Sequence, residues 1–153
     1  MANGRTHQRV GLATGGVAAF LHAAGDDRAN VVVETLAGVL GGWHGAMLPD
    51  ILEPATSPNH RKIAHSVLTA VGGVLGAATH GHKIADLRAV AANLAAEANS
   101  VRATNAIRAV LLDLAALIVQ AAVGYLVGLA AGYASHLLLD AATPRGLPFV
   151  GLN

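Results

Sequence analysis

The sequence contains no cysteine, few aromatic residues and little charge. The absence of cysteine excludes disulfide bonds and thiolate metal ligands. Aromatic residues make up 3% of the 153 residues and charged residues 12%, against about 25% charged residues in an average globular protein. The net charge is +1 with no block of basic residues, so we do not expect a nucleic acid partner.

Small and aliphatic residues dominate what is present. Apolar residues make up 54% of the chain, and there are 18 glycines. Small residues allow the backbones of membrane helices to approach closely, although a tightly packed soluble helical bundle has a similar composition. The low charge and the length of the apolar runs favour the membrane. We therefore expect residues 1–153 to form a single membrane-embedded domain in contact with the lipid bilayer.

Four apolar runs separated by polar turns predict an all-α integral membrane bundle of about four transmembrane helices. They cover residues 8–24, 31–48, 63–79 and about 107–142. The first three have about 17–18 residues each, which is close to the shortest helix that crosses a bilayer. Residues 50–62 hold two prolines and are predicted to be a loop.

The stretch between the third and fourth runs is amphipathic. In residues 84–98, apolar side chains recur every three or four positions with charged residues between them. This pattern predicts one amphipathic helix, at the bilayer surface or across the end of the bundle. Residues 80–83 (His-Gly-His-Lys) are predicted to separate it from the third run.

Glycine pairs and two acidic residues lie within or near the apolar runs. The Gly-Gly pairs at 15–16, 41–42 and 72–73 are predicted contact points between membrane helices. Glu34 and Asp113 carry a charge that is costly inside a membrane. We therefore expect both side chains to face the bundle interior or the interface.

Candidate metal ligands gather at particular ends of the runs. Four crossings would place the start of the first run, the end of the second, the start of the third and the end of the fourth on one side of the membrane. These ends carry His7, Asp50, His60, His65, His136 and Asp140. Imidazole and carboxylate without thiolate suit a catalytic site for a divalent metal, with Zn²⁺ expected and Mn²⁺ or Fe²⁺ as alternatives. The number of ligands suits one or two ions, with Asp50 or Asp140 as the bridge between two.

The spacing of these residues ranks them. His136 and Asp140 are four apart, so they share one face of a helix. His60 and His65 are five apart and would point about 140° away from each other on one helix. We therefore expect His65 to be a ligand, and His60 to be a ligand or a substrate contact. The predicted catalytic set is Asp50, His65, His136 and Asp140.

Two arginines stand beside the predicted ligands. Arg61 follows His60, and Arg145 lies shortly after Asp140. Guanidinium groups bind phosphate and carboxylate through paired hydrogen bonds. Both arginines are predicted to bind an anionic group of the substrate.

The same residues stand in motifs that resemble a known family. In chain order the motifs are Thr6-His7, Leu48-Pro49-Asp50, residues 60–66 (His-Arg-Lys-Ile-Ala-His-Ser) and residues 132–148. They resemble the bacterial membrane-bound, metal-dependent hydrolases, a family that includes LexA-regulated inner-membrane hydrolase-like proteins. Three positions depart from the family pattern. Where the family has a second acid two residues after Asp50, this chain has Leu52, which Glu53 follows. Where the family has Gly and Thr before His65, this chain has Lys62 and Ala64.

The resemblance implies a multi-pass protein of the bacterial inner (cell) membrane with hydrolase activity. A distant similarity of the family to zinc-dependent phospholipase C implies a phosphoester. We therefore expect a metal-dependent hydrolase that acts, through metal-activated water, on a phospholipid or another lipid-linked substrate. Two alternatives stay open, a membrane protein that handles metal or protons and a non-catalytic structural or assembly protein. Each of the three is compatible with a homo-oligomer.

Overall fold

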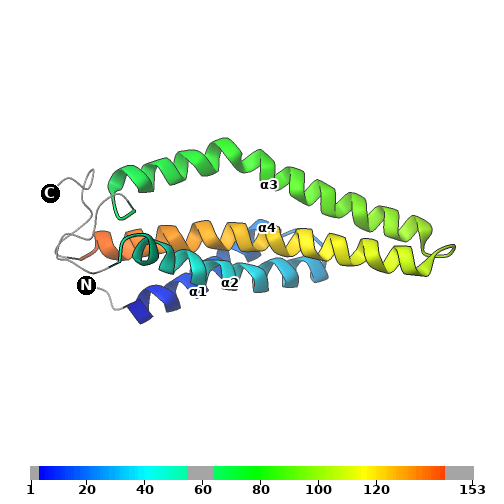
Figure 1. The fold of residues 1–153 in the computed structure, drawn as a ribbon, viewed down its shortest axis with the longest axis horizontal. Coiled ribbons are helices and arrows are strands. Elements are labelled where there is room, and N and C mark those ends of the chain that lie inside the picture. The colour runs from blue at the N-terminus through cyan, green and yellow to red at the C-terminus, as the bar shows by residue number, and fades with distance from the viewer. Residues whose placement is uncertain (1–3, 55–63, 144–153) are drawn as a thin grey trace.

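The computed structural model describes residues 4–54 and 64–143, with side chains in the first half of α3 described only at Thr69 and Gly73. It contains four helices: α1 (Gly4–Ala23), α2 (Arg28–Leu52), α3 (Val67–Val101) and α4 (Ala106–Ala141). They form an elongated bundle in which the hairpin of α3 and α4 extends beyond the turn between α1 and α2 (Figure 1). Within the described ranges no residue is in a strand, which confirms the all-α prediction.

The predicted number of transmembrane helices is wrong. Two helices in the described part of the chain, α2 and α4, are long and apolar enough to cross a membrane. α1 falls short because it is rich in glycine and polar near its start. In α3 the apolar part runs directly into the polar residues 80–83, so no long apolar window forms.

The separate amphipathic helix at 84–98 is also a wrong prediction. α3 runs without interruption through residues 80–83 and contains the amphipathic stretch. A single glycine costs a helix only about 1 kcal/mol, so Gly81 does not end it without a proline nearby. The predicted loop at 50–62 likewise begins later, because α2 continues past Pro49 to Leu52, and the backbone N–H of Glu53 donates to the Pro49 carbonyl. Residues 55–63 lie outside the described residues.

Backbone contact at glycine holds three of the helices together. α2 packs against both α1 and α4, whereas α3 packs against α4. A Cβ added at Gly42 in α2 would lie 2.7 Å from the Cα of Gly15 in α1. On the α4 side, a Cβ added at Gly132 would lie 2.7 Å from the Cα of Gly42 itself. The glycine pairs at 15–16 and 41–42 are therefore contact points, as predicted, but a Cβ added at Gly73 of the third pair would meet no described atom within 4 Å.

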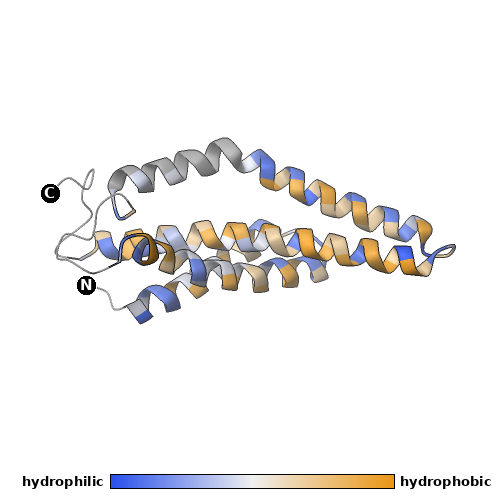
Figure 2. Cartoon of the chain, viewed as in Figure 1, coloured by the Kyte–Doolittle hydropathy of each residue, from blue (hydrophilic) through white to orange (hydrophobic). Residues whose placement is uncertain are grey.

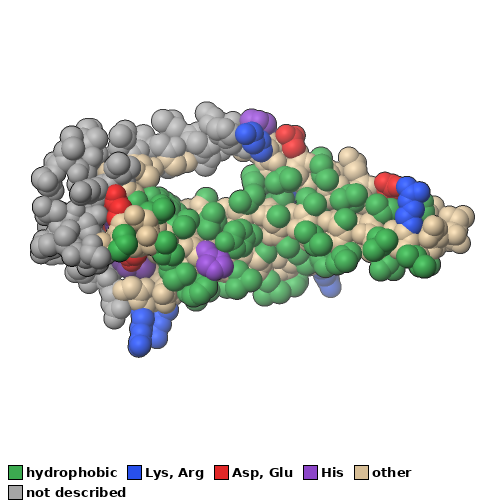
Figure 3. Space-filling view, viewed as in Figure 1, with side chains coloured by type: hydrophobic (Ala, Val, Ile, Leu, Met, Phe, Trp, Pro, Cys, Tyr) green, Lys and Arg blue, Asp and Glu red, His purple; other side chains and the backbone are tan. Residues whose placement is uncertain are grey.

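The distribution of apolar side chains suits a lipid environment. The buried apolar side chains are mostly alanines, while many leucines and valines are exposed. Figure 2 shows apolar residues along most of α2 and α4, and Figure 3 shows apolar side chains covering much of the visible face. With glycine and alanine inside, the large aliphatic side chains are left to face the hydrocarbon chains of lipids.

Candidate metal centre

Five of the predicted ligands lie together at one end of the bundle. They are His7 at the start of α1, Asp50 near the end of α2, His65 just before α3, and His136 and Asp140 near the end of α4. The two histidines 65 and 136 are 0% and 1% exposed and Asp140 is 2% exposed. The Asp50 side chain is 49% exposed, so the cluster opens to the outside on its Asp50 side.

The ligand atoms of this cluster face one another. The Nε2 atoms of His65 and His136 are 3.3 Å apart. Asp50 Oδ1 lies 3.3 Å from the His65 Nε2 and 3.8 Å from the His136 Nε2. Asp140 Oδ2 lies 3.6 Å from the His136 Nε2 and 3.8 Å from the His65 Nε2. Ligand atoms about 2.0–2.1 Å from a tetrahedral metal are separated by roughly 3.4 Å, so these distances match a slightly widened coordination shell.

The hydrogen bonds of the two histidines fix their tautomers. His136 Nδ1 lies 2.6 Å from the Ala46 carbonyl oxygen, and His65 Nδ1 lies 3.1 Å from a Glu53 carboxylate oxygen. Both partners are acceptors, so in each ring Nδ1 carries a hydrogen, and in the neutral form of the ring Nε2 presents its lone pair. Two imidazole lone pairs and two carboxylates then face one another. Such a set of acceptors fits a divalent cation, as in metal-binding histidines oriented through their second nitrogen.

Asp140 connects this group to His7. Its Oδ1 lies 3.6 Å from the His7 Nε2, while its Oδ2 faces His65 and His136. The His7 ring stacks on the His136 ring, with centroids 3.9 Å apart and an interplanar angle of 20°. Of the two carboxylates considered as bridges, Asp140 is the one whose two oxygens point to different histidines.

Glycine contact and two side-chain hydrogen bonds position the cluster. Gly132 touches α2 one turn before His136, which brings the ends of α2 and α4 together. The Tyr133 hydroxyl donates to the Ala64 carbonyl oxygen at 2.7 Å and ties the segment that holds His65 to α4. Ser66 caps the start of α3 by accepting the Thr69 N–H at 3.2 Å.

Glu53 is a further candidate site residue, which the sequence indicates only as the acid that follows Leu52. Its carboxylate orients His65 from the side opposite Asp50. Burial lowers the pKa of His65, but the hydrogen bonds to Asp50 and Glu53 and the charge of Asp140 together raise the pKa above its usual value. The signal available in the sequence was an acid three residues after Asp50.

The remaining predicted site residues are His60, Arg61 and Arg145, and they lie outside the described residues. The other described histidines of the helices lie away from the cluster. His44 Nδ1 is 3.1 Å from the Tyr125 hydroxyl, within the bundle. His22 contacts Glu34, which is sixteen residues before Asp50 in α2 and therefore about 24 Å away along the helix.

A family model described as YdjM inner membrane protein matches residues 1–150. No curated protein and no solved structure matches the chain. The match covers all five clustered ligands and both helices that could cross a membrane. It agrees with the inner-membrane location that the sequence motifs implied.

Proposed function

This chain belongs to the YdjM inner membrane protein family, and we propose that it is a membrane-bound metal-dependent hydrolase. The observation that carries the proposal is the pair of Nε2 atoms in His65 and His136, 3.3 Å apart with both Nδ1 atoms engaged. With the rings neutral and the Asp50 and Asp140 carboxylates beside them, these lone pairs form a set of acceptors that suits a divalent metal.

The distances between the described side chains suggest which residues would hold the metal. Asp50, His65 and His136 form one group that could hold a metal, and the Oδ2 of Asp140 lies 3.8 Å from the His65 Nε2 of this group. His7 and the Oδ1 of Asp140 supply part of a second position. Nitrogen and oxygen ligands without thiolate suit Zn²⁺, with Mn²⁺ or Fe²⁺ as alternatives. When bound, such an ion polarises a phosphoryl oxygen and lowers the pKa of a water molecule.

The chain's own groups divide the remaining work. Asp50 is the exposed ligand, so it is the side chain placed to accept a proton from an attacking water. Glu53 keeps the hydrogen of His65 on Nδ1 and so keeps Nε2 available as a ligand. His65, His136 and Asp140 are shielded from solvent, which strengthens their electrostatic interactions.

The surroundings of the cluster support a lipid-associated substrate. Ile51 and Leu52, next to Asp50, are 62% and 64% exposed. They end a helix that could cross the membrane, so the open side of the cluster adjoins the lipid surface. A phosphoester follows from the motif resemblance, and Arg61 and Arg145 are proposed to bind its anionic group.

The test measures whether the zinc-loaded protein, solubilised in detergent, hydrolyses a phospholipid and a soluble aryl phosphate. We expect hydrolysis of the phospholipid and loss of activity by about 100-fold or more in Asp50→Asn. Asp86→Asn, which makes the same chemical change on an exposed position of α3, serves as the matched control and should retain activity. Equal activity of Asp50→Asn and wild type, or no hydrolysis of either substrate, would contradict the proposal.

A second candidate is a membrane protein that handles protons or metal without hydrolysis. It is favoured by the polar side chains at other depths of the bundle, since Glu34 and His44 lie in the same helix as Asp50. Proton or zinc flux through reconstituted vesicles would distinguish it. Flux that is lost in Glu34→Gln, with no hydrolysis by wild type, would favour this candidate.

A further inference from the structure

The contact between α1 and α2 begins beside the metal cluster and runs toward the middle of the bundle. The Gln8 amide of α1 donates to the Met47 sulfur of α2 at 3.3 Å. About two turns farther along α1, a Cβ added at Gly16 would lie 2.7 Å from a methyl carbon of Val39. Because the residue numbers of these contacts rise in α1 and fall in α2, the two helices are antiparallel in a fixed register.

This register places two further pairs of residues at the same levels. Leu12 and Trp43 are each midway between the residues of the two contacts, so they lie at one level. Continued in the other direction, the register places Arg5 at the level of Asp50. We define the α1–α2 edge as the line of Gln8, Leu12 and Gly16 in α1 and Met47, Trp43 and Val39 in α2. Apart from the glycine, all of these residues are half-buried, so the edge is accessible from outside the bundle.

The α1–α2 edge changes from polar to apolar with distance from the metal cluster. Arg5 and Arg9 are exposed at the end beside Asp50, where Figure 3 shows basic side chains projecting from the bundle. The Gln8 amide lies between the two arginines along α1, and the rest of the edge carries no charged or hydrogen-bonding side chain except the indole of Trp43. Cationic groups, a hydrogen-bond donor and an apolar surface follow one another in this order. The same order of phosphate, ester carbonyl and acyl chain in a phospholipid complements it.

The length of α2 places this change of polarity at the membrane surface. Its 25 residues extend about 38 Å, against about 30 Å for the hydrocarbon core of a bilayer, so both ends of α2 reach the headgroup layers. Asp50 lies two residues before the end of α2, and Trp43 lies about 10 Å farther in. Tryptophan is enriched where headgroups meet hydrocarbon. The single tryptophan of the chain thus marks the level at which the acyl chains begin.

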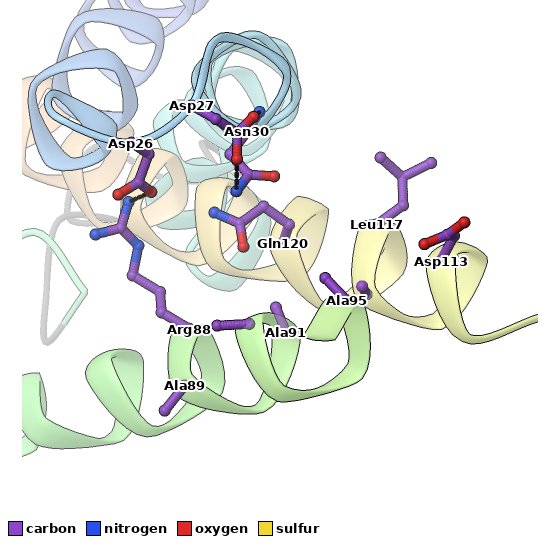
Figure 4. A pocket seen from close by; sticks show the side chains of 12 residues that line it. Asp26, Asp27, Asn30, Arg88, Ala89, Ala91, Ala95, Asp113, Leu117 and Gln120 are labelled. Atoms are coloured by element: carbon purple, nitrogen blue, oxygen red, sulfur yellow. Dashed lines mark hydrogen bonds and ion pairs between the residues drawn. The ribbon is translucent and has the colours of Figure 1, made fainter. Parts of the chain in front are cut away.

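Polar side chains at the opposite end of α2 are engaged with one another. Figure 4 shows Arg88 of α3 beside Asp26, with which it pairs, and Asp27 bonded to Asn30. The Arg88 Nε also donates at 3.0 Å to Glu34, which is 0% exposed. These polar groups therefore serve the packing of the helices, unlike the exposed arginines at the cluster end.

We propose that the α1–α2 edge binds one phospholipid molecule with its phosphate at the level of Asp50. Arg5 pairs with the phosphate, the Gln8 amide donates to an ester carbonyl, and one acyl chain lies on Leu12 and Trp43. The Gln8 amide gains from this exchange, because a carbonyl oxygen is a stronger acceptor than the thioether sulfur that it contacts. Delivery of the phosphate to a metal rests on the proposed function, whereas binding of the lipid along the edge does not.

The fluorescence of Trp43 tests the proposal, because it is the only tryptophan and bromine on an acyl chain quenches a tryptophan that it contacts. The full chain would be purified in detergent with a chelator, so that hydrolysis does not consume the lipid. It would then be titrated with phosphatidylglycerol brominated on its acyl chains. We expect quenching that saturates. Brominated diacylglycerol has the same chains without a phosphate and should need an about ten-fold higher concentration for half of the quenching.

Two substitutions test the contacts along the edge, each with a matched control. Leu12→Ala should raise the half-saturating concentration about five-fold, whereas Leu21→Ala, at a 64% exposed position of α1 away from the edge, should bind as wild type does. Gln8→Leu should also raise it about five-fold, whereas Asn93→Leu, at an exposed position of α3, should leave it unchanged. Circular dichroism of each variant checks that its helices are retained.

Three results would overturn the proposal. They are quenching that rises with lipid concentration without saturating, diacylglycerol that quenches as well as phosphatidylglycerol, and an edge variant that binds lipid as its control does. Hydrolysis by the zinc-loaded protein is a separate measurement. Saturable binding without hydrolysis would contradict the proposed function alone, and hydrolysis without saturable binding would contradict this proposal alone.

Discussion

Gly132→Ala is the substitution whose effect follows most directly from the packing. A Cβ at position 132 would lie 2.7 Å from both the Cα and the carbonyl carbon of Gly42, where ordinary contacts begin at 3.4 Å. Both neighbours are backbone atoms, so no side chain can rotate away. We expect α2 and α4 to separate by about 1 Å at this level. The separation falls one turn before His136, and therefore beside the metal cluster.

The magnitude has two parts. Overpacking costs about 1–3 kcal/mol, and replacing glycine by alanine inside a helix returns about 1 kcal/mol, so the free energy of unfolding should fall by about 0–2 kcal/mol. We expect Gly132→Ala to affect zinc affinity more strongly than it affects the free energy of unfolding. Ligands must be held within about 0.5 Å of their working geometry, and a shift of 1 Å between Asp50 and His136 exceeds that tolerance. We expect zinc affinity to fall about 10- to 100-fold.

Zinc titration by calorimetry and denaturant unfolding, both in detergent, measure these two quantities. Gly81→Ala is the matched control, because Gly81 is in α3 and a Cβ added there would meet no described atom within 4 Å. It should raise the free energy of unfolding by about 1 kcal/mol and leave zinc affinity unchanged. If Gly132→Ala behaves as Gly81→Ala does in both measurements, the close contact of α2 with α4 is not what positions the metal ligands.

Three further predictions concern single charged or titrating groups. Glu34→Leu removes the buried acceptor of the Gln120 amide and one of the two acidic partners of Arg88, so it should lower the free energy of unfolding by about 1–3 kcal/mol, measured by denaturant unfolding. An unchanged midpoint would contradict a structural role for these contacts of Glu34. Glu53→Gln should weaken zinc binding about 10- to 100-fold in calorimetry while the unfolding midpoint stays close to wild type, and unchanged affinity would show that Glu53 does not orient His65. Because the pKa of His65 lies above its usual value, zinc affinity should rise with pH until the pH passes that pKa and then level off, and affinity independent of pH down to about 5 would refute this. The same raised pKa stabilises the metal-free fold below about pH 6.5, and this contribution is lost as pH rises through the folded-state pKa of His65.

The sequence was informative wherever one helix determined the geometry. His136 and Asp140 are four apart, and the spacing alone places them on one face of α4. Glu34 was expected to face the bundle interior or the interface because a charge is costly in a membrane, and its side chain is fully buried. Glycine pairs inside apolar runs indicated close helix contacts, which Gly42 makes on two sides.

Features that depend on contacts between distant segments could not be predicted from the sequence. Gln120 and Glu34 are 86 residues apart, and no periodic pattern links them. The continuity of α3 was missed because Gly81 and its polar neighbours resemble a turn. Helix α3 nevertheless continues through these residues and packs against α4. Glu53 was passed over because its role depends on the path that brings His65 back to the end of α2.

Metal content is the measurement that tests the central claim most directly. Wild-type protein and His136→Ala would be purified in detergent after growth with zinc, and the metal would be quantified by elemental analysis. We expect wild type to hold about one equivalent or more of a transition metal, and His136→Ala to lose most of it while its helical circular dichroism is retained. Wild-type protein that binds no transition metal, or a His136→Ala variant that retains as much as wild type, would contradict the account.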